Sequence, residues 1–153
     1  MAEATSRLYV PSLGGIYSAA HEYAEPILRI ALGAILIPHG CQKLFGLFGG
    51  MGFTANAALF DKLGYTPGVF WGTLVGCTEI IGGILLILGL FTRFAAAAVL
   101  IFMLTAMKFT SAKSFFWANG GMEYSLLIGI CALFFLIRGG GNCSLDRTIG
   151  REI

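Results

Sequence analysis

Charge is what this sequence lacks most. Of its 153 residues, 12% are charged and 57% are hydrophobic, and the mean hydropathy is +0.82. A soluble domain carries roughly 25% charged residues, so eight acids and ten bases are too few to coat a globule of this size in water. The composition excludes an ordinary soluble enzyme, a disordered chain and a low-complexity repeat. It indicates a small integral membrane protein.

Residues that hold metals or disulfides are also scarce. The chain has four cysteines without a CxxC pair and two histidines, of which His21 lies outside the predicted spans. We therefore expect neither a metal site nor a disulfide framework. Phosphate-binding glycine loops, HExxH and GxSxG are absent as well. With a net charge of +2 and no run of Lys or Arg, nucleic acid is not an expected partner.

Hydrophobic runs are numerous but interrupted by charge. None reaches the length of about 18 uncharged residues that marks a simple transmembrane helix, so the spans must contain charges near their ends or paired inside. The chain has room for four spans of about 20 residues, predicted at residues 27–48, 69–90, 93–108 and 122–138. A short amphipathic helix is predicted from Thr54 as N-cap to Gly64. Apolar residues at helical spacing over 13–24 predict a further helix at the membrane surface.

The sequence thus predicts an all-α fold, an integral membrane four-helix bundle with a short amphipathic helix in the first connection. We expect an N-terminal interfacial segment (1–26), a transmembrane domain (27–138) and a polar C-terminal tail (139–153). Four spans place both termini on one side, with six arginines there against four lysines on the other. This excess favours termini in the cytoplasm. The arginines are Arg7, Arg29, Arg93, Arg138, Arg147 and Arg151, and the lysines are Lys43, Lys62, Lys108 and Lys113.

Ionisable residues at membrane depth form the candidate site. At 1.5 Å per residue, His39 and Glu79 fall roughly 18 and 15 Å above the side of the termini. Glu79 shares a helix face with small residues that let a neighbouring helix approach closely, so it should point into the bundle. We expect His39 to meet Glu79, and Lys43 to reach toward Glu123. The candidate polar cluster is therefore His39, Lys43, Glu79 and Glu123.

A second set of charges is predicted at the side of the termini. Arg29, Arg93, Arg138 and Asp146 are expected to form a structural ionic layer there. For the candidate polar cluster, two interpretations stay open, because buried charges that fix helix register and functional sites look alike in sequence. One is a pocket that binds a ligand or moves protons, and the other is a purely structural ion network.

Short stretches in order along the chain carry a family resemblance. They are Arg29 with Gly33, HGCQKL at 39–44, EIIGG at 79–83, GLFTR at 89–93, GME at 121–123 and GGNCSLD at 140–146. Over about residues 27–146 the chain resembles the DoxX family of small four-helix bacterial membrane proteins. The resemblance implies a component of a membrane oxidoreductase system. One branch is similar to the large subunit of thiosulfate:quinone oxidoreductase, and others are proposed parts of thiol or redox-stress complexes.

Three functions remain open from the sequence. The first is a quinone-linked oxidoreductase subunit in the bacterial cytoplasmic (inner) membrane, working with other membrane protein subunits. A quinone needs an apolar groove with a few donors and a proton carrier, expected here near His39 and Glu79. The second is a non-catalytic accessory or assembly subunit of a larger respiratory or membrane complex. The third, less favoured, is a small-molecule or proton carrier, because no inverted repeat is evident. The catalytic residues, the electron donor and the acceptor are not readable from the sequence.

Overall fold

The computed structural model describes residues 8–151, and all regular structure in this range is helical. Its α-helices are α1 (Gly14–Phe45), α2 (Gly52–Lys62), α3 (Gly68–Leu88), α4 (Thr92–Thr110), α5 (Glu123–Arg138) and α6 (Leu145–Ile149). Three short 3-10 turns accompany them, η1 (Pro11–Leu13), η2 (Leu47–Gly49) and η3 (Trp117–Asn119).

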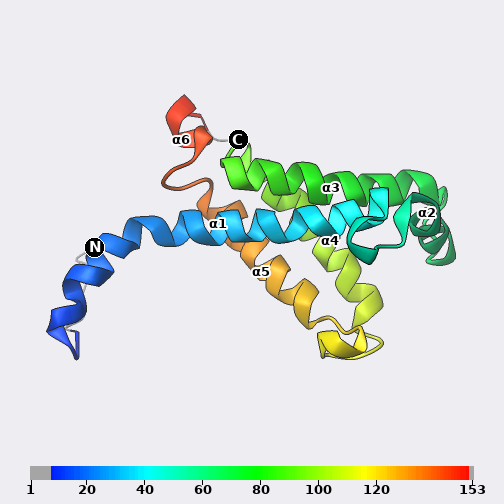
Figure 1. Cartoon of the computed structure of the whole chain (residues 1–153), viewed down its shortest axis with the longest axis horizontal. Helices are drawn as coiled ribbons and strands as arrows, with labels where there is room; N and C mark the ends of the chain where they lie inside the picture. The colour runs from blue at the N-terminus through cyan, green and yellow to red at the C-terminus, as the bar shows by residue number, and fades with distance from the viewer. Residues whose placement is uncertain (1–7, 152–153) are drawn as a thin grey trace.

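The four long helices α1, α3, α4 and α5 form the bundle. Helix α1 lies along α3, α4 packs on α3, and α5 packs mainly on α4 (Figure 1). Completely or almost completely buried side chains from all four helices make the core: Leu36, Leu86, Ala96, Val99, Ala132 and Phe135. The predicted all-α bundle is confirmed.

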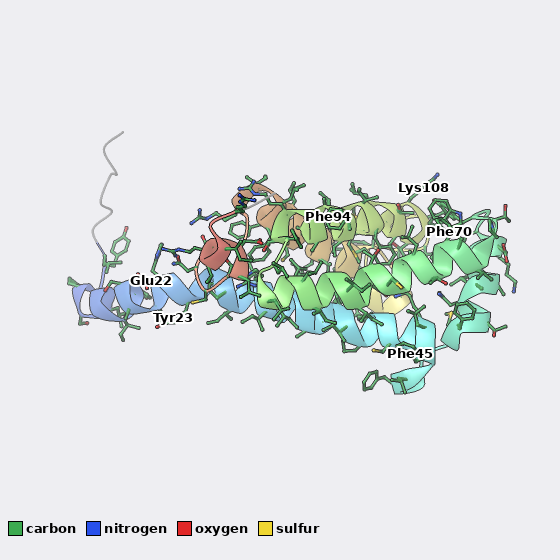
Figure 2. The ribbon with its side chains drawn as sticks, turned by 90° about the horizontal axis from the view of Figure 1, so that it is seen from above. Glu22, Tyr23, Phe45, Phe70, Phe94 and Lys108 are labelled. Carbon is green, nitrogen blue, oxygen red and sulfur yellow. The ribbon has the colours of Figure 1, made fainter. Side chains whose placement is uncertain are left out.

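The outside of the bundle is apolar. Large side chains such as Ile81, Phe94 and Ile101 are more than half exposed, and Figure 2 shows Phe45 and Phe70 toward the outside, at the end of the bundle near α2. So large an exposed apolar surface suits lipid and not water. The segment Pro11–Phe45, α3 and α4 are each long and apolar enough to cross a membrane. Helix α5 has 16 residues, about 24 Å, so its crossing of a core of about 30 Å stays a prediction.

Glycines bring α1 and α3 into close contact. A Cβ atom placed on Gly40 would lie 2.8 Å from the Gly76 carbonyl oxygen, and one on Gly83 would lie 2.8 Å from the Gly33 carbonyl oxygen. Contact between backbones at two points is the packing mode of small residues in membrane helices. The glycine face predicted for the second span is thus the face that meets the first span.

The N-terminal part of α1 differs from expectation. The sequence led us to separate a surface helix from a first span beginning at Ile27, but one helix runs from Gly14 through Pro26 and Pro38 to Phe45. Pro26 is buried, and the Glu25 Oε1 accepts a hydrogen bond from Arg138 Nε at 2.7 Å. These contacts hold the helix together where the proline removes a backbone donor. Figure 1 shows the first turns, in dark blue, extending beyond the bundle and bending away from it.

The amphipathic helix of the first connection is present as α2. The Asn56 Nδ2 donates to the Gly72 carbonyl at 3.1 Å, and the Gly68 amide donates to Asp61 Oδ1 at 2.7 Å. Both bonds hold α2 against the N-terminal end of α3. Helix α2 therefore forms a third wall beside α3 and α4, which matters for the cavities described next.

Candidate functional site

The centre of the site is an ion pair between α1 and α3. Lys43 Nζ lies 2.6 Å from Glu79 Oε1 and 2.7 Å from Oε2. Glu79 is only 2% exposed, whereas a quarter of the Lys43 side chain remains accessible. Lys43 Nζ also lies 5.7 Å from the centroid of the Phe102 ring on α4. A fully buried carboxylate is thus neutralised by a base whose stem reaches it from the neighbouring helix.

The prediction that His39 is the partner of Glu79 was wrong. Gly40, not His39, faces α3 at this level, because a Cβ on Gly40 would lie 3.1 Å from the Glu79 Cβ. Lys43 is three residues after Gly40 and lies on the same helix face, so it meets Glu79. His39 lies about 100° from Gly40 around the helix axis and one turn before Lys43, and it contacts α5 instead. Its Nε2 lies 3.4 Å from the Tyr124 hydroxyl of α5, and the two rings pack with centroids 5.7 Å apart.

Glu123 does not reach Lys43 as expected. Its Oε2 accepts a hydrogen bond from the Trp117 amide at 3.2 Å, which ties the start of α5 to η3. The neighbouring Tyr124 takes the place beside His39 instead. The sequence predicts where α5 begins but not which way its first turn faces. The prediction therefore chose Glu123, whereas Tyr124, one residue later, joins the site.

A small polar cavity lies among these residues. It has a volume of about 140 Å³, and His39, Lys43, Glu79, Tyr124 and Ser125 line its polar part. The volume is sufficient for several water molecules, and the polar side chains supply the partners that buried water needs. The cavity can therefore connect the ion pair with the His39–Tyr124 pair through hydrogen-bonded water.

A larger apolar groove lies on the other side of Lys43. We call it the aromatic groove; it has a volume of about 530 Å³ and runs between α2, α3 and α4. Lys43, Phe102 and Ala106 line both this groove and the small cavity. Its remaining aromatic walls are Phe60, Tyr65, Trp71 and Phe109. The sequence analysis missed this groove, because nothing in the spacing of Tyr65 and Trp71 along the chain reveals a common groove.

The predicted ionic layer lies around the ends of the helices that face the termini. Arg29 is fully buried and donates to the carbonyls of Ile87 at 3.0 Å and Cys143 at 2.9 Å. Asp146 accepts from the amides of Phe91 at 2.7 Å and Thr92 at 2.9 Å, at the start of α4. Charges here satisfy backbone groups at helix ends.

The two remaining arginines of this layer bind α5 and α1. Arg93 donates to the carbonyls of Leu136 and Ile137 at 3.2 and 3.1 Å, and Arg138 pairs with Glu25. Within residues 8–151, no group of three His, Cys, Asp or Glu side chains is placed to hold a metal ion. The chemistry available near the membrane centre is therefore that of the ion pair, the His39–Tyr124 pair and the two cavities.

These features define a class, a helical membrane protein with an ion pair buried between its first two spans. A family model of DoxX matches residues 26–119, and the chain belongs to the DoxX family. That match includes Lys43, Glu79 and all of the aromatic groove, and it ends before Tyr124.

The relatives that match are mostly without an assigned activity. An uncharacterized protein of Haemophilus influenzae is 35% identical over 139 residues, 85% of this chain and 93% of its own length. An uncharacterized membrane protein of Mycobacterium tuberculosis is 30% identical over 138 residues, 82% of this chain and 80% of its own. A Bacillus subtilis protein named "Putative oxidoreductase CatD" is 28% identical over 107 residues, 70% of this chain and 74% of its own. No solved structure matches this chain.

Proposed function

We propose that this protein is an integral membrane subunit of a redox assembly in the bacterial cytoplasmic membrane, linked to quinone. The observation that carries the proposal is the Lys43–Glu79 pair, which lies between a polar cavity and an apolar groove. Ionisable groups at membrane depth are costly and commonly serve ligands or protons. The name of the Bacillus subtilis relative supports the same direction.

The arrangement suits a reaction that moves protons together with electrons. Reduction of a quinone to a quinol takes up two electrons and two protons. The electrons would come from a thiol-class or thiosulfate donor through a partner subunit. The protons would pass through the small cavity, where His39 and Tyr124 lie beside the ion pair. His is the side chain best suited to such transfer near neutral pH.

The test is purification in mild detergent, identification of co-purifying subunits, and quinone reduction in liposomes with a thiol or thiosulfate donor. We expect turnover by the co-purified assembly. Glu79→Gln, which keeps the volume but removes the charge, should lower kcat by about 10² to 10⁴, the usual contribution of a proton-transfer group. Lys108→Gln on the outer face of α4 is the matched control and should keep full activity. A stable assembly that neither binds nor reduces quinone would remove the proposal.

A non-catalytic assembly subunit is the second candidate, favoured by one specific observation. The first turns of α1 extend beyond the bundle with Ile16, Tyr17 and Tyr23 more than half exposed. Figure 2 shows Glu22 and Tyr23 on this extension, away from the other helices. Under this alternative, Glu79→Gln should reduce recovery of the whole complex while leaving turnover per assembled complex unchanged. The same variant therefore separates the two functions.

A further inference from the structure

We infer that the aromatic groove between α2, α3 and α4 is the binding site of a flat, lipid-soluble ring compound whose oxygen accepts a hydrogen bond from Lys43. The inference rests on the proposed function for its expectation that this ring is a quinone. It differs from the sequence-based expectation, which placed the ligand beside His39 and Glu79. His39 and Glu79 then line the small polar cavity, and the ligand occupies the aromatic groove on the other side of Lys43.

The two cavities differ in volume. Sites for small organic ligands have volumes of about 300–1,000 Å³. The aromatic groove, at about 530 Å³, lies within this range, whereas the polar cavity, at about 140 Å³, lies below it. The polar cavity is therefore of a size for water molecules, and a ligand ring is accommodated in the groove. Lys43 lines both spaces, so a ligand in the groove reaches the ion pair without entering the polar cavity.

The polar groups that line the groove favour a ligand with a hydrogen-bond acceptor. Among its described lining residues there is no carboxylate. The hydroxyls of Thr78, Thr105 and Thr110 donate to carbonyls of their own helices, so they offer no free proton. An ammonium group has three N–H donors, and the two Glu79 oxygens take two of those of Lys43. The third remains for a ligand, whose matching group is a carbonyl or phenolate oxygen.

The walls of the groove suit a ring better than an acyl chain. Tyr65 lies edge-to-face with Phe60 of α2, Trp71 of α3 and Phe109 of α4, with centroids 6.2, 5.6 and 5.7 Å away. One loop residue thus joins the three helices that enclose the groove. Aromatic side chains add about 0.5–1.5 kcal/mol per favourable ring contact beyond buried area. An acyl chain would use neither these ring contacts nor the donor of Lys43.

The lipid phase is the source of the ligand. Leu74 of α3 and Ile101 of α4 line the groove and are 45% and 66% exposed on the apolar outside of the bundle. A compound dissolved in the bilayer reaches the groove sideways between these helices. A water-soluble compound would have to cross the same apolar surface, which is unfavourable.

The two tryptophans of the chain make the inference testable. Trp71 lines the groove, whereas Trp117 is 67% exposed in η3 and lines neither cavity. Trp117→Phe leaves Trp71 as the single fluorophore, and Trp71→Phe leaves Trp117 as its matched control. We expect decylubiquinone to quench Trp71 with saturation in the full-length protein in detergent. The quenching of Trp117 should rise linearly, as for a quinone that only dissolves in the micelle.

Two substitutions on α4 locate the site. Ala98→Phe places a ring in the groove, whereas Ala97→Phe alters a neighbouring residue that lines neither cavity. In the Trp117→Phe background, Ala98→Phe should weaken quinone binding at least tenfold and Ala97→Phe less than threefold. Lys43→Met combined with Glu79→Gln, which removes both charges together, should weaken it about tenfold through loss of the hydrogen bond to the charged group. Equal effects of the two alanine variants would overturn the inference.

A lipid occupant gives a different result. Phospholipid with dibrominated acyl chains would quench Trp71 strongly, and decylubiquinone would not relieve this quenching, which would overturn the inference. Failure of the proposed function is distinguishable. Saturable quinone binding at Trp71 without turnover by any co-purified assembly keeps the binding site and removes the redox function. Turnover without saturable quenching of Trp71 keeps the function and removes this site.

Discussion

At the scale of single residues, the protein depends on the balance of two charges. Glu79 is buried almost completely, and both of its carboxylate oxygens accept a hydrogen bond from Lys43 Nζ. In a medium of low polarity, a carboxylate without its base is far costlier than the pair. The pair therefore contributes little net stability, but removing either residue leaves the other with an unpaired charge.

This asymmetry predicts a specific result for the two residues. Lys43→Met should destabilise the protein by about 3–5 kcal/mol, because Glu79 then remains buried without a base. The double variant Lys43→Met/Glu79→Leu should recover most of that loss. The measurement is the free energy of unfolding in mixed detergent micelles. Lys108→Met, at an exposed site, serves as control and should change it by less than about 0.5 kcal/mol. Equal losses in the single and double variants would contradict this explanation.

At the scale of elements, the contact between α1 and α3 positions the ion pair. Gly40 lies opposite Gly76 and Glu79, so the backbones approach closely enough for the Lys43 side chain to reach the carboxylate. Gly33 and Gly83 form the second contact further along the same two helices. Any side chain added at these positions would push α1 away from α3.

Adjacent glycines of α3 test this packing. Gly83→Ala should destabilise by about 1–3 kcal/mol, because its Cβ would lie 2.8 Å from both the Gly33 carbonyl oxygen and Ile37 Cγ1. Gly82→Ala is the control, since its Cβ would lie 3.5 Å from Val99 Cγ2, an ordinary contact. It should be neutral or stabilising by up to about 1 kcal/mol through helix propensity. Thermal unfolding in detergent measures both, and similar melting temperatures for the two variants would exclude the close contact.

At the scale of the whole molecule, the distribution of charge predicts an orientation in the membrane. Within residues 8–151, the arginines lie at the end with the C-terminal segment, where Arg29 and Arg93 bind the ends of neighbouring helices. Lysines lie at the opposite end, in the last turns of α1, α2 and α4 and in the connection after α4. The arginine excess favours the side of the termini as cytoplasmic.

Cysteine labelling checks this orientation. Cys143 is the exposed cysteine of the described chain, and it lies in the C-terminal segment. With the other three cysteines replaced by serine, a membrane-impermeant maleimide should label Cys143 only after spheroplasts are permeabilised. In a variant with Cys143→Ser and Ala112→Cys, the label should react in intact spheroplasts, because residue 112 is exposed in the connection after α4. The reverse pattern would place the termini outside.

Much of this architecture is readable in the sequence because it depends on composition and local spacing. Scarce charge and long apolar stretches require a lipid environment. The glycine spacing around Glu79 marks the buried face of α3, and Gly64 marks the end of α2. The predicted N-cap was wrong, because α2 begins at Gly52 with Met51 as its N-cap and Thr54 lies inside the helix. The long α1 was not readable, because the contact of Glu25 with Arg138 joins residues 113 positions apart.

The sequence by itself determined that this chain forms apolar helices with a few ionisable side chains at membrane depth, because those properties are local. Only the tertiary structure decided which of them meet. His39 and Lys43 lie one turn apart on the same side of α1, so which of them neutralises Glu79 depends on how α1 packs against α3. Whether Glu123 or Tyr124 joins the site depends on a rotation of about 100° per residue around the axis of α5. The aromatic groove is likewise a property of three helices and one loop together, so no single segment encodes it.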